Sequence, residues 1–200
     1  INRDLKWSKH IENVKSECHY WLPVLRRLRK YLSQRQLKTI AEGLIMSRLR
    51  YYLTAWGAEF VRFEESDPTR TVFHDLQVVQ NDALQTITGN KRSDHVRVWD
   101  MLTSTKMLSM NQLAGYGLLL ELWKSRAFDV PLLLSLHVRG GTSGMSLRSD
   151  TSNNLRATVV EPYSLCTEKL WNLTSDRLKL TNLVTVAKIE ARATALRLPL

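Results

Sequence analysis

The chain has 200 residues, of which 44% are hydrophobic, and its 29 Lys and Arg outnumber 19 Asp and Glu to give a formal net charge of +10. Two cysteines are too few for a disulfide scaffold, and no apolar stretch approaches the length that spans a bilayer. The opening residues show no secretory-signal pattern, so we expect an intracellular protein of the cytoplasm or nucleus.

The first predicted element is a helical hairpin over residues 1–60. Apolar residues from Trp7 to Leu32 recur every three or four positions, which predicts an amphipathic helix, and we expect Pro23 to kink or split it. Ser33 and Gln36 have the spacing of a capping box, so a second helix should begin there. It should end at Gly57 in the left-handed conformation that closes many helices, with the two helices antiparallel.

The hairpin holds most of the positive charge. Residues 1–60 carry twelve Lys or Arg against five Asp or Glu, so +7 of the net charge lies in under a third of the chain. Basic side chains that face phosphates release condensed counterions, which favours binding to a nucleic-acid backbone. The candidate backbone contacts are Arg26, Arg27, Arg29, Lys30, Lys38, Arg48 and Arg50. A solvated basic face without a ligand is the alternative interpretation.

Aromatic residues are interspersed among these cations. Tyr31 and Tyr51 are candidates for stacking on bases, a recognised mode of single-strand binding. Other aromatic residues fall on the apolar stripe and should belong to the core: Trp7, Trp21, Tyr52 and Trp56.

The following section, residues 61–100, has five basic and seven acidic residues, so we expect it to support the hairpin rather than contact the same anion. An acidic connection over residues 58–66 leads to a helix that starts at Asp67-Pro68 and closes at Gly89. A shorter helix from Asp94 to Leu102 should turn Val96, Val98, Trp99 and Leu102 inward.

A longer helix, capped by Ser109, should run over residues 110–127. The apolar run 132–138 fits either a short helix or a buried extended piece. Residues 139–156 are rich in Gly and Ser and indicate a flexible linker; they lack the pattern of a phosphate-binding loop. Helices over Pro162–Leu173 and Asn182–Leu196 should follow.

These elements predict an all-α fold, an irregular helical bundle. Its parts are the basic hairpin (1–60), a helical extension (61–138), the linker (139–156) and a C-terminal helical segment (157–200). No catalytic residue stands out. Glu64-Glu65 is an adjacent acidic pair in a predicted connection, and His10, Cys18 and His19 lack a fourth ligand for zinc, so we expect neither a metal nor a cofactor.

Several short motifs resemble one family. Asp4-Leu5-Lys6-Trp7-Ser8-Lys9-His10-Ile11 resembles the L-x-W-x-x-H-I that follows the last palm strand in non-LTR retrotransposon reverse transcriptases of the Jockey and CR1-like type. Further pieces resemble the same proteins in the same order: residues 47–51 (SRLRY), 56–57 (WG), 76–84 (LQVVQNDAL), 87–89 (ITG), 108–113 (LSMNQL), 121–124 (ELWK), 170–172 (LWN) and 198–200 (LPL). The chain departs from that pattern at Gln85, where Arg is usual, and at Thr174, where Pro is usual.

The resemblance implies that the hairpin is a thumb, which holds the template-primer duplex, and that a helical C-terminal extension follows it. Palm carboxylates and their Mg²⁺ would then lie elsewhere in the polypeptide, and this chain would be a non-catalytic fragment of an RNA-directed DNA polymerase. Its expected partners are an RNA/DNA template-primer and the rest of that polypeptide, with no membrane and no small-molecule substrate. The alternative is a helical protein-interaction module that docks on an acidic partner or on the rest of its own polyprotein.

Overall fold

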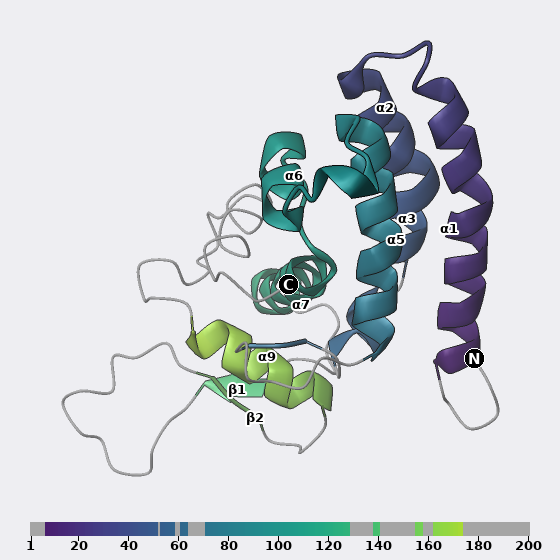
Figure 1. The fold of residues 1–200 in the computed structure, drawn as a ribbon. Helices are drawn as coiled ribbons and strands as arrows, with labels where there is room; N and C mark the ends of the chain where they lie inside the picture. Colours follow the sequence, from purple (N-terminus) through teal and green to yellow (C-terminus); the bar gives the residue numbers. More distant parts are fainter. Residues whose placement is uncertain are drawn as a thin grey trace. The chain divides into compact units, whose positions relative to one another are not determined.

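The computed structural model describes residues 7–51, 53–58, 61–63, 71–128, 138–140, 155–157 and 162–173 (Figure 1). These residues are predominantly helical, which confirms the predicted helical fold class; one short two-stranded ribbon is added within the described part. Contacts divide the chain into two compact units. One holds residues 7–51 and 71–110, and the other holds the remaining described residues.

The first unit begins with the predicted hairpin. Helix α1 (Ser8–Leu28) buries one apolar stripe, made of Ile11, Val14, Cys18, Leu22 and Leu25. It packs against the helical segment that follows it. The helix runs unbroken through Pro23, so the split expected there does not occur. Pro23 lies on the exposed side of α1, where water can satisfy the backbone carbonyl that lacks its usual N–H donor.

The second arm begins as predicted and then departs from a regular α-helix. The capping box that starts α2 (Gln34–Ala41) is present, with the Ser33 N–H 3.0 Å from Gln36 Oε1. A π-turn, η1 (Glu42–Met46), then interrupts the arm before α3 (Ser47–Arg50). Ser47 Oγ and Arg48 Nη1 donate hydrogen bonds to the carbonyls of residues 43 and 44, each at 2.5 Å, and so stabilise this irregular turn.

The predicted single helix up to Gly57 is therefore wrong. After α3 the chain forms a separate short helix, α4 (Leu53–Trp56). Gly57 is not in the left-handed conformation. Its N–H donates to Leu53 O at 2.7 Å, and a Cβ there would approach that oxygen to 2.4 Å, so close backbone contact accounts for the glycine.

Helix α5 (Thr71–Thr88) packs against both α1 and α2, which confirms that this section supports the hairpin (Figure 1). It buries an apolar stripe: Phe73, Leu76, Val79, Ala83, Leu84 and Ile87. Gly89 ends the helix with φ +88°, as predicted. The expected start at Asp67-Pro68 and most of the acidic connection lie outside the described residues.

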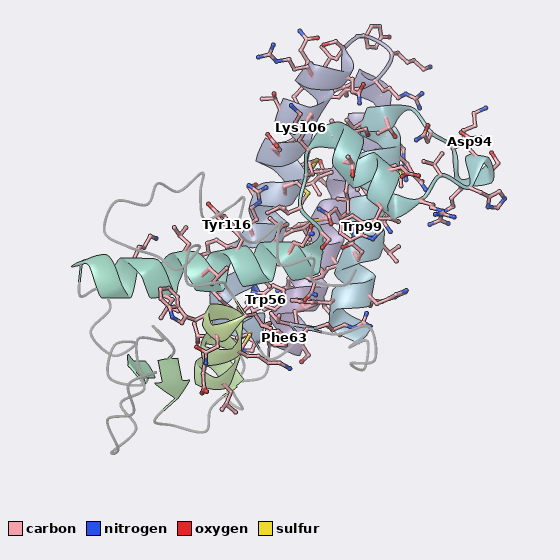
Figure 2. All side chains as sticks on the ribbon, turned by 90° about the vertical axis from the view of Figure 1, so that its left-hand side faces the viewer. Trp56, Phe63, Asp94, Trp99, Lys106 and Tyr116 are labelled. Atoms are coloured by element: carbon pink, nitrogen blue, oxygen red, sulfur yellow. The ribbon has the colours of Figure 1, made fainter. Side chains whose placement is uncertain are left out.

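Helix α6 (Val98–Thr105) packs on α5 and starts four residues later than predicted. The preceding residues form a 3₁₀ turn, η3 (Arg92–Asp94), because Asp94 Oδ2 accepts the Lys91 N–H at 2.6 Å. This turn extends away from α5 and α6 in Figure 2, where Asp94 is labelled. Val96 and Trp99, expected to point inward, are 37% and 43% exposed.

The second unit is built around α7 (Met110–Phe128), whose extent matches the prediction. Gly117 permits the close approach of α4, because a Cβ would lie 2.5 Å from Thr54 Cγ2. Helix α9 (Pro162–Asn172) also forms as predicted. The core of this unit contains Ala58, Leu118, Leu119, Cys166 and Leu170.

The ends of the predicted linker form an antiparallel ribbon, with β1 (Val138–Gly140) paired to β2 (Leu155–Ala157). Arg139 is opposite Arg156 in this register. Residues 141–154, the apolar run 132–137 and the expected helix Asn182–Leu196 lie outside the described residues.

Candidate nucleic-acid interface

The turn between α1 and α2 is the most basic part of the first unit. From residue 18 to residue 41 the sequence contains six Lys or Arg and no Asp or Glu. Four of these cations, Arg26, Arg27, Arg29 and Lys30, are exposed at the end of α1 and in the turn. Tyr31, between them and α2, is 81% exposed, which suits its predicted stacking role.

The carboxyl end of α5 brings further cations to this turn. Arg29 Nη2 donates to Gly89 O at 2.8 Å, which holds the turn against the end of α5. Asp82 Oδ2 lies 3.8 Å from Arg26 Nη2, and its Oδ1 lies 3.5 Å from Arg92 Nη2. One carboxylate therefore lies between two arginines from different elements, and its single charge leaves the pair with a net positive charge.

Helices α2 and α6 border an open hollow of about 540 Å³, and Ser33, the last residue of the turn, is among its lining residues. Its lining contains three cations, Arg35, Lys38 and Lys106, and the described residues that line it include no acidic side chain. The remaining lining residues are Ser33, Gln34, Ile87, Ser104 and Thr105. Figure 2 labels Lys106 at the end of α6, where its backbone is left-handed, with φ 52°.

We call this end of the first unit the tip surface, defined by nine basic residues: Arg26, Arg27, Arg29, Lys30, Arg35, Lys38, Lys91, Arg92 and Lys106. Four of them have an observed partner: Arg26 and Arg92 at Asp82, Arg29 at Gly89 O, and Lys38 at Glu42, 3.5 Å away. Within the described part of the chain, the other five form no ion pair.

The two remaining predicted contacts, Arg48 and Arg50, lie elsewhere. Arg48 donates to Glu17 Oε2 at 2.9 Å and to Leu44 O, and its guanidinium carbon lies 5.5 Å from the Trp21 ring centroid. Two of its five N–H donors are thus used within the fold, and one of its partners is a carboxylate. Since α1 rises about 1.5 Å per residue, Glu17 is roughly 14 Å along the helix from Arg26, and Arg50 is farther still.

Tyr51 lies beside Arg48 and not at the tip surface. Both border a second hollow, of about 530 Å³, which His10, Glu17 and Ser47 also line. Tyr51 is 59% exposed, and its ring centroid lies 6.3 Å from that of His10. The structure therefore separates the two candidate stacking tyrosines, and the carboxylate of Glu17 makes the second hollow a poorer site for an anion.

Of the aromatic residues assigned to the core, Trp56 is 2% exposed, whereas Trp7 and Trp21 are half-buried and Tyr52 is outside the described residues. Cys18 and Cys166 are buried, and desolvation raises their pKa values to about 11 and about 12. Both are therefore neutral thiols at physiological pH.

The set considered for zinc does not converge, because Cys18 lies on the buried face of α1 while the next residue, His19, is exposed. In the part of the chain that the structure describes, no three His, Cys, Asp or Glu side chains gather where they could hold a metal ion.

Sequence reasoning missed Lys91, Arg92 and Lys106, and it placed Arg35 outside the selected contacts. Lys91 and Arg92 belong to a section whose net charge is negative, so a sum over the section hides them. In the fold, the ion pair of Arg92 with Asp82 brings Lys91 and Arg92 near the α1–α2 turn. Lys106 lines the hollow together with Ser33 of the turn and residues of α2. A sequence signal did exist, since Lys91 and Arg92 directly follow the helix-ending Gly89-Asn90.

None of the described helices is both long and apolar enough to cross a membrane. Comparison with protein-family models, with curated proteins and with solved structures found no match to this chain.

Proposed function

We propose that the chain binds the sugar-phosphate backbone of nucleic acid through the tip surface. The observation that carries this proposal is the gathering of nine basic side chains from four parts of the fold at one end of the first unit, while residues 18–41 contain no acidic residue. A dense positive surface binds phosphates largely without regard to base sequence.

The carboxylates at this end do not cancel its charge. Asp82, Glu42 and Asp94 are three acidic residues beside nine basic ones. The Arg26 and Arg92 side chains remain 57% and 76% exposed in their contacts with Asp82. Both ion pairs are long, at 3.8 and 3.5 Å, and each leaves most of its arginine side chain in solvent, so an incoming phosphate can still contact these arginines.

The motif resemblance supports a more specific form of this proposal. The chain would be the thumb and downstream extension of a non-LTR retrotransposon reverse transcriptase, and its ligand an RNA/DNA template-primer. The chain would then be non-catalytic, and carboxylates in a palm elsewhere in the polypeptide would hold the Mg²⁺ that supports phosphoryl transfer. The fold is compatible with this assignment, because a helical hairpin supported by α5 presents the basic turn to one side.

Two charge-matched double variants test the location of binding. Arg27→Gln with Lys30→Gln removes two tip cations that make no ion pair among the described residues. Lys9→Gln with Arg50→Gln removes the same charge near the opposite end of the hairpin. We expect the tip variant to weaken duplex binding about tenfold or more, since each lost phosphate contact forfeits its counterion release, and the control variant to change it much less. Equal losses would refute the tip surface as the binding site.

A protein-interaction module is the second candidate, and one observation favours it. Val96 and Trp99 are 37% and 43% exposed, with Arg97 close to both in sequence, and aromatic residues and arginine are enriched in protein interfaces. Under that hypothesis Trp99→Ala would abolish partner binding and excess polyanion would leave it intact. Under the nucleic-acid hypothesis the polyanion would compete and Trp99→Ala would have little effect.

A further inference from the structure

We propose that the hollow between α2 and α6 binds a phosphomonoester, the dianionic phosphate at the end of a nucleic-acid strand or on a free nucleotide. This inference rests on the proposed function and extends it, because it adds a site for one terminal phosphate to a surface proposed to contact backbone phosphodiesters. It rests on the residues that line the hollow, two of which, Arg35 and Lys106, were not among the predicted contacts.

The charge of the hollow matches a doubly negative group. Arg35, Lys38 and Lys106 contribute three positive charges, and Glu42, 3.5 Å from Lys38, offsets one of them. About two net positive charges remain. A phosphomonoester carries roughly −1.5 to −2 at pH 7, compared with −1 for a phosphodiester, so the terminal group fits better.

The hydroxyl groups that line the hollow already donate hydrogen bonds within the protein. Ser33 Oγ donates to Gln36 Oε1 at 2.8 Å, and Thr105 Oγ1 donates to Met101 O at 2.7 Å. Ser104 Oγ likewise donates to Met101 O at 3.0 Å. Since these hydroxyl protons are already used, an anion in the hollow would be held by Arg35, Lys38, Lys106 and the Gln34 amide.

The size of the hollow admits more than a phosphate. Its volume of about 540 Å³ lies within the usual range for small-molecule sites, roughly 300 to 1,000 Å³. Ile87 adds an apolar wall. A terminal nucleotide could therefore enter with its phosphate at the cations and its sugar or base against Ile87.

Lys106 offers a variant that removes the cation without weakening the fold. Its backbone is left-handed, at φ 52° and ψ 47°, a conformation in which glycine is the most favourable residue. Lys106→Gly should therefore leave α6 intact or make the protein more stable, while it removes one of the three cations. Arg35→Gln is the second variant, and Lys91→Gln is the matched control, because it removes a tip cation outside the hollow.

The test measures Kd for short single strands that carry a phosphate at the 5′ end, at the 3′ end or at neither, at one fixed salt concentration. We expect the unmodified protein to bind a phosphorylated strand about tenfold more tightly than the hydroxyl strand, the effect of one added charged contact. Lys106→Gly and Arg35→Gln should abolish this preference, whereas Lys91→Gln should weaken all strands equally and keep it. The proposal would be overturned if neither the 5′-phosphorylated nor the 3′-phosphorylated strand bound more tightly than the hydroxyl strand. It would also be overturned if Lys106→Gly kept the preference for a phosphorylated strand.

Competition by a nucleoside monophosphate and by inorganic phosphate identifies the source of the group and separates the two proposals. If the mononucleotide displaces the phosphorylated strand from the unmodified protein but not from Arg35→Gln, the result supports phosphate binding in the hollow. If strands bind with strong salt dependence but without end preference, the hollow proposal fails and the tip surface stands. If no strand binds while the mononucleotide does so through Arg35 and Lys106, the proposed function fails and the phosphate site of the hollow stands.

Discussion

The basic side chains of the tip surface differ in how far the fold fixes them. Arg29 is held on the Gly89 carbonyl, and Arg26 and Arg92 are oriented by Asp82. Arg27 and Lys30 extend from the turn without an ion pair among the described residues. The fixed arginines lose less conformational entropy when they bind a phosphate, while Arg27 and Lys30 have no contact among the described residues that would restrict their adjustment to the spacing of the ligand.

At the same scale, the ion pair between Lys15 and Asp75 links α1 to α5 and predicts a pH dependence. The hydrogen bond from Lys15 Nζ, 2.5 Å from Asp75 Oδ2, lowers the pKa of Asp75. A carboxyl whose pKa is lower in the folded state stabilises the protein above its ordinary pKa of about 4 and loses that contribution as pH falls through the folded value. Asp75→Asn should therefore destabilise the protein at pH 7 by a small amount that vanishes in acid.

Urea denaturation at several pH values measures this difference. Glu12→Gln, which removes an exposed carboxylate from the interior of α1 that has no ion pair in the described part, is the control and should show no such trend. A destabilisation by Asp75→Asn that stays constant down to pH 2 would show that the ion pair is not its cause.

Two glycines in the first unit should respond to alanine in opposite directions. Gly89 has φ +88°, and a Cβ there would lie 2.6 Å from Arg29 Nη2, so Gly89→Ala should lower the free energy of unfolding by about 1–2 kcal/mol. Gly43 lies in the helical arm with no heavy atom within 4 Å of an added Cβ. Gly43→Ala should raise the free energy of unfolding by about 0.5–1 kcal/mol. Chemical denaturation of both variants checks the signs, and a stabilising Gly89→Ala would contradict the structure at that turn.

At the scale of elements, the start of α2 shows what local sequence can predict. Ser33 and Gln36 satisfy one another's backbone N–H groups within four residues, so the interaction needs no tertiary contact and the boundary was correctly predicted. The π-turn that follows was not predicted. It depends on Arg48, whose position is set by Glu17 and Trp21 of the facing helix, and hydrophobic periodicity carries no information about that contact.

The capping box itself gives a quantitative prediction. Ser33→Ala leaves the Gln36 N–H without its side-chain acceptor and should destabilise the protein by about 1 kcal/mol. Ser16→Ala, at an exposed interior position of α1, is the matched control and should be neutral or slightly stabilising. The difference in urea midpoints measures the effect, and equal midpoints for the two variants would argue that Ser33 does not cap α2.

The start of α6 illustrates the opposite case. The apolar spacing of Val96, Val98, Trp99 and Leu102 predicted a helix from Asp94, but Asp94 instead closes a 3₁₀ turn and His95 is left-handed, with φ 49°. An aspartate can cap or close several kinds of turn, so its presence does not identify the first residue of a helix. The same displacement left Val96 and Trp99 exposed.

At the scale of the whole molecule, the units are not consecutive in sequence. Residues 53–58 and 61–63 belong to the unit of α7 and α9, although they lie between the hairpin and α5. Composition shifts along the chain therefore could not predict the division. The candidate site also combines residues distant in sequence, since Arg35 and Lys38 border a hollow with Lys106, about seventy residues away. The positive charge of the hairpin could be predicted from the sequence, whereas the cations that complete the site could be identified only from the fold.

The salt dependence of duplex binding tests the central claim most directly. Each phosphate neutralised contributes about −0.9 to the slope of log K against log salt, so full use of the nine tip cations would give a slope of about −8. We predict a linear dependence with a slope between about −3 and −8, reduced in magnitude by up to about 1.8 in the Arg27→Gln, Lys30→Gln variant. A flat dependence, or a slope that this variant leaves unchanged, would contradict the assignment of the tip surface to nucleic-acid phosphates.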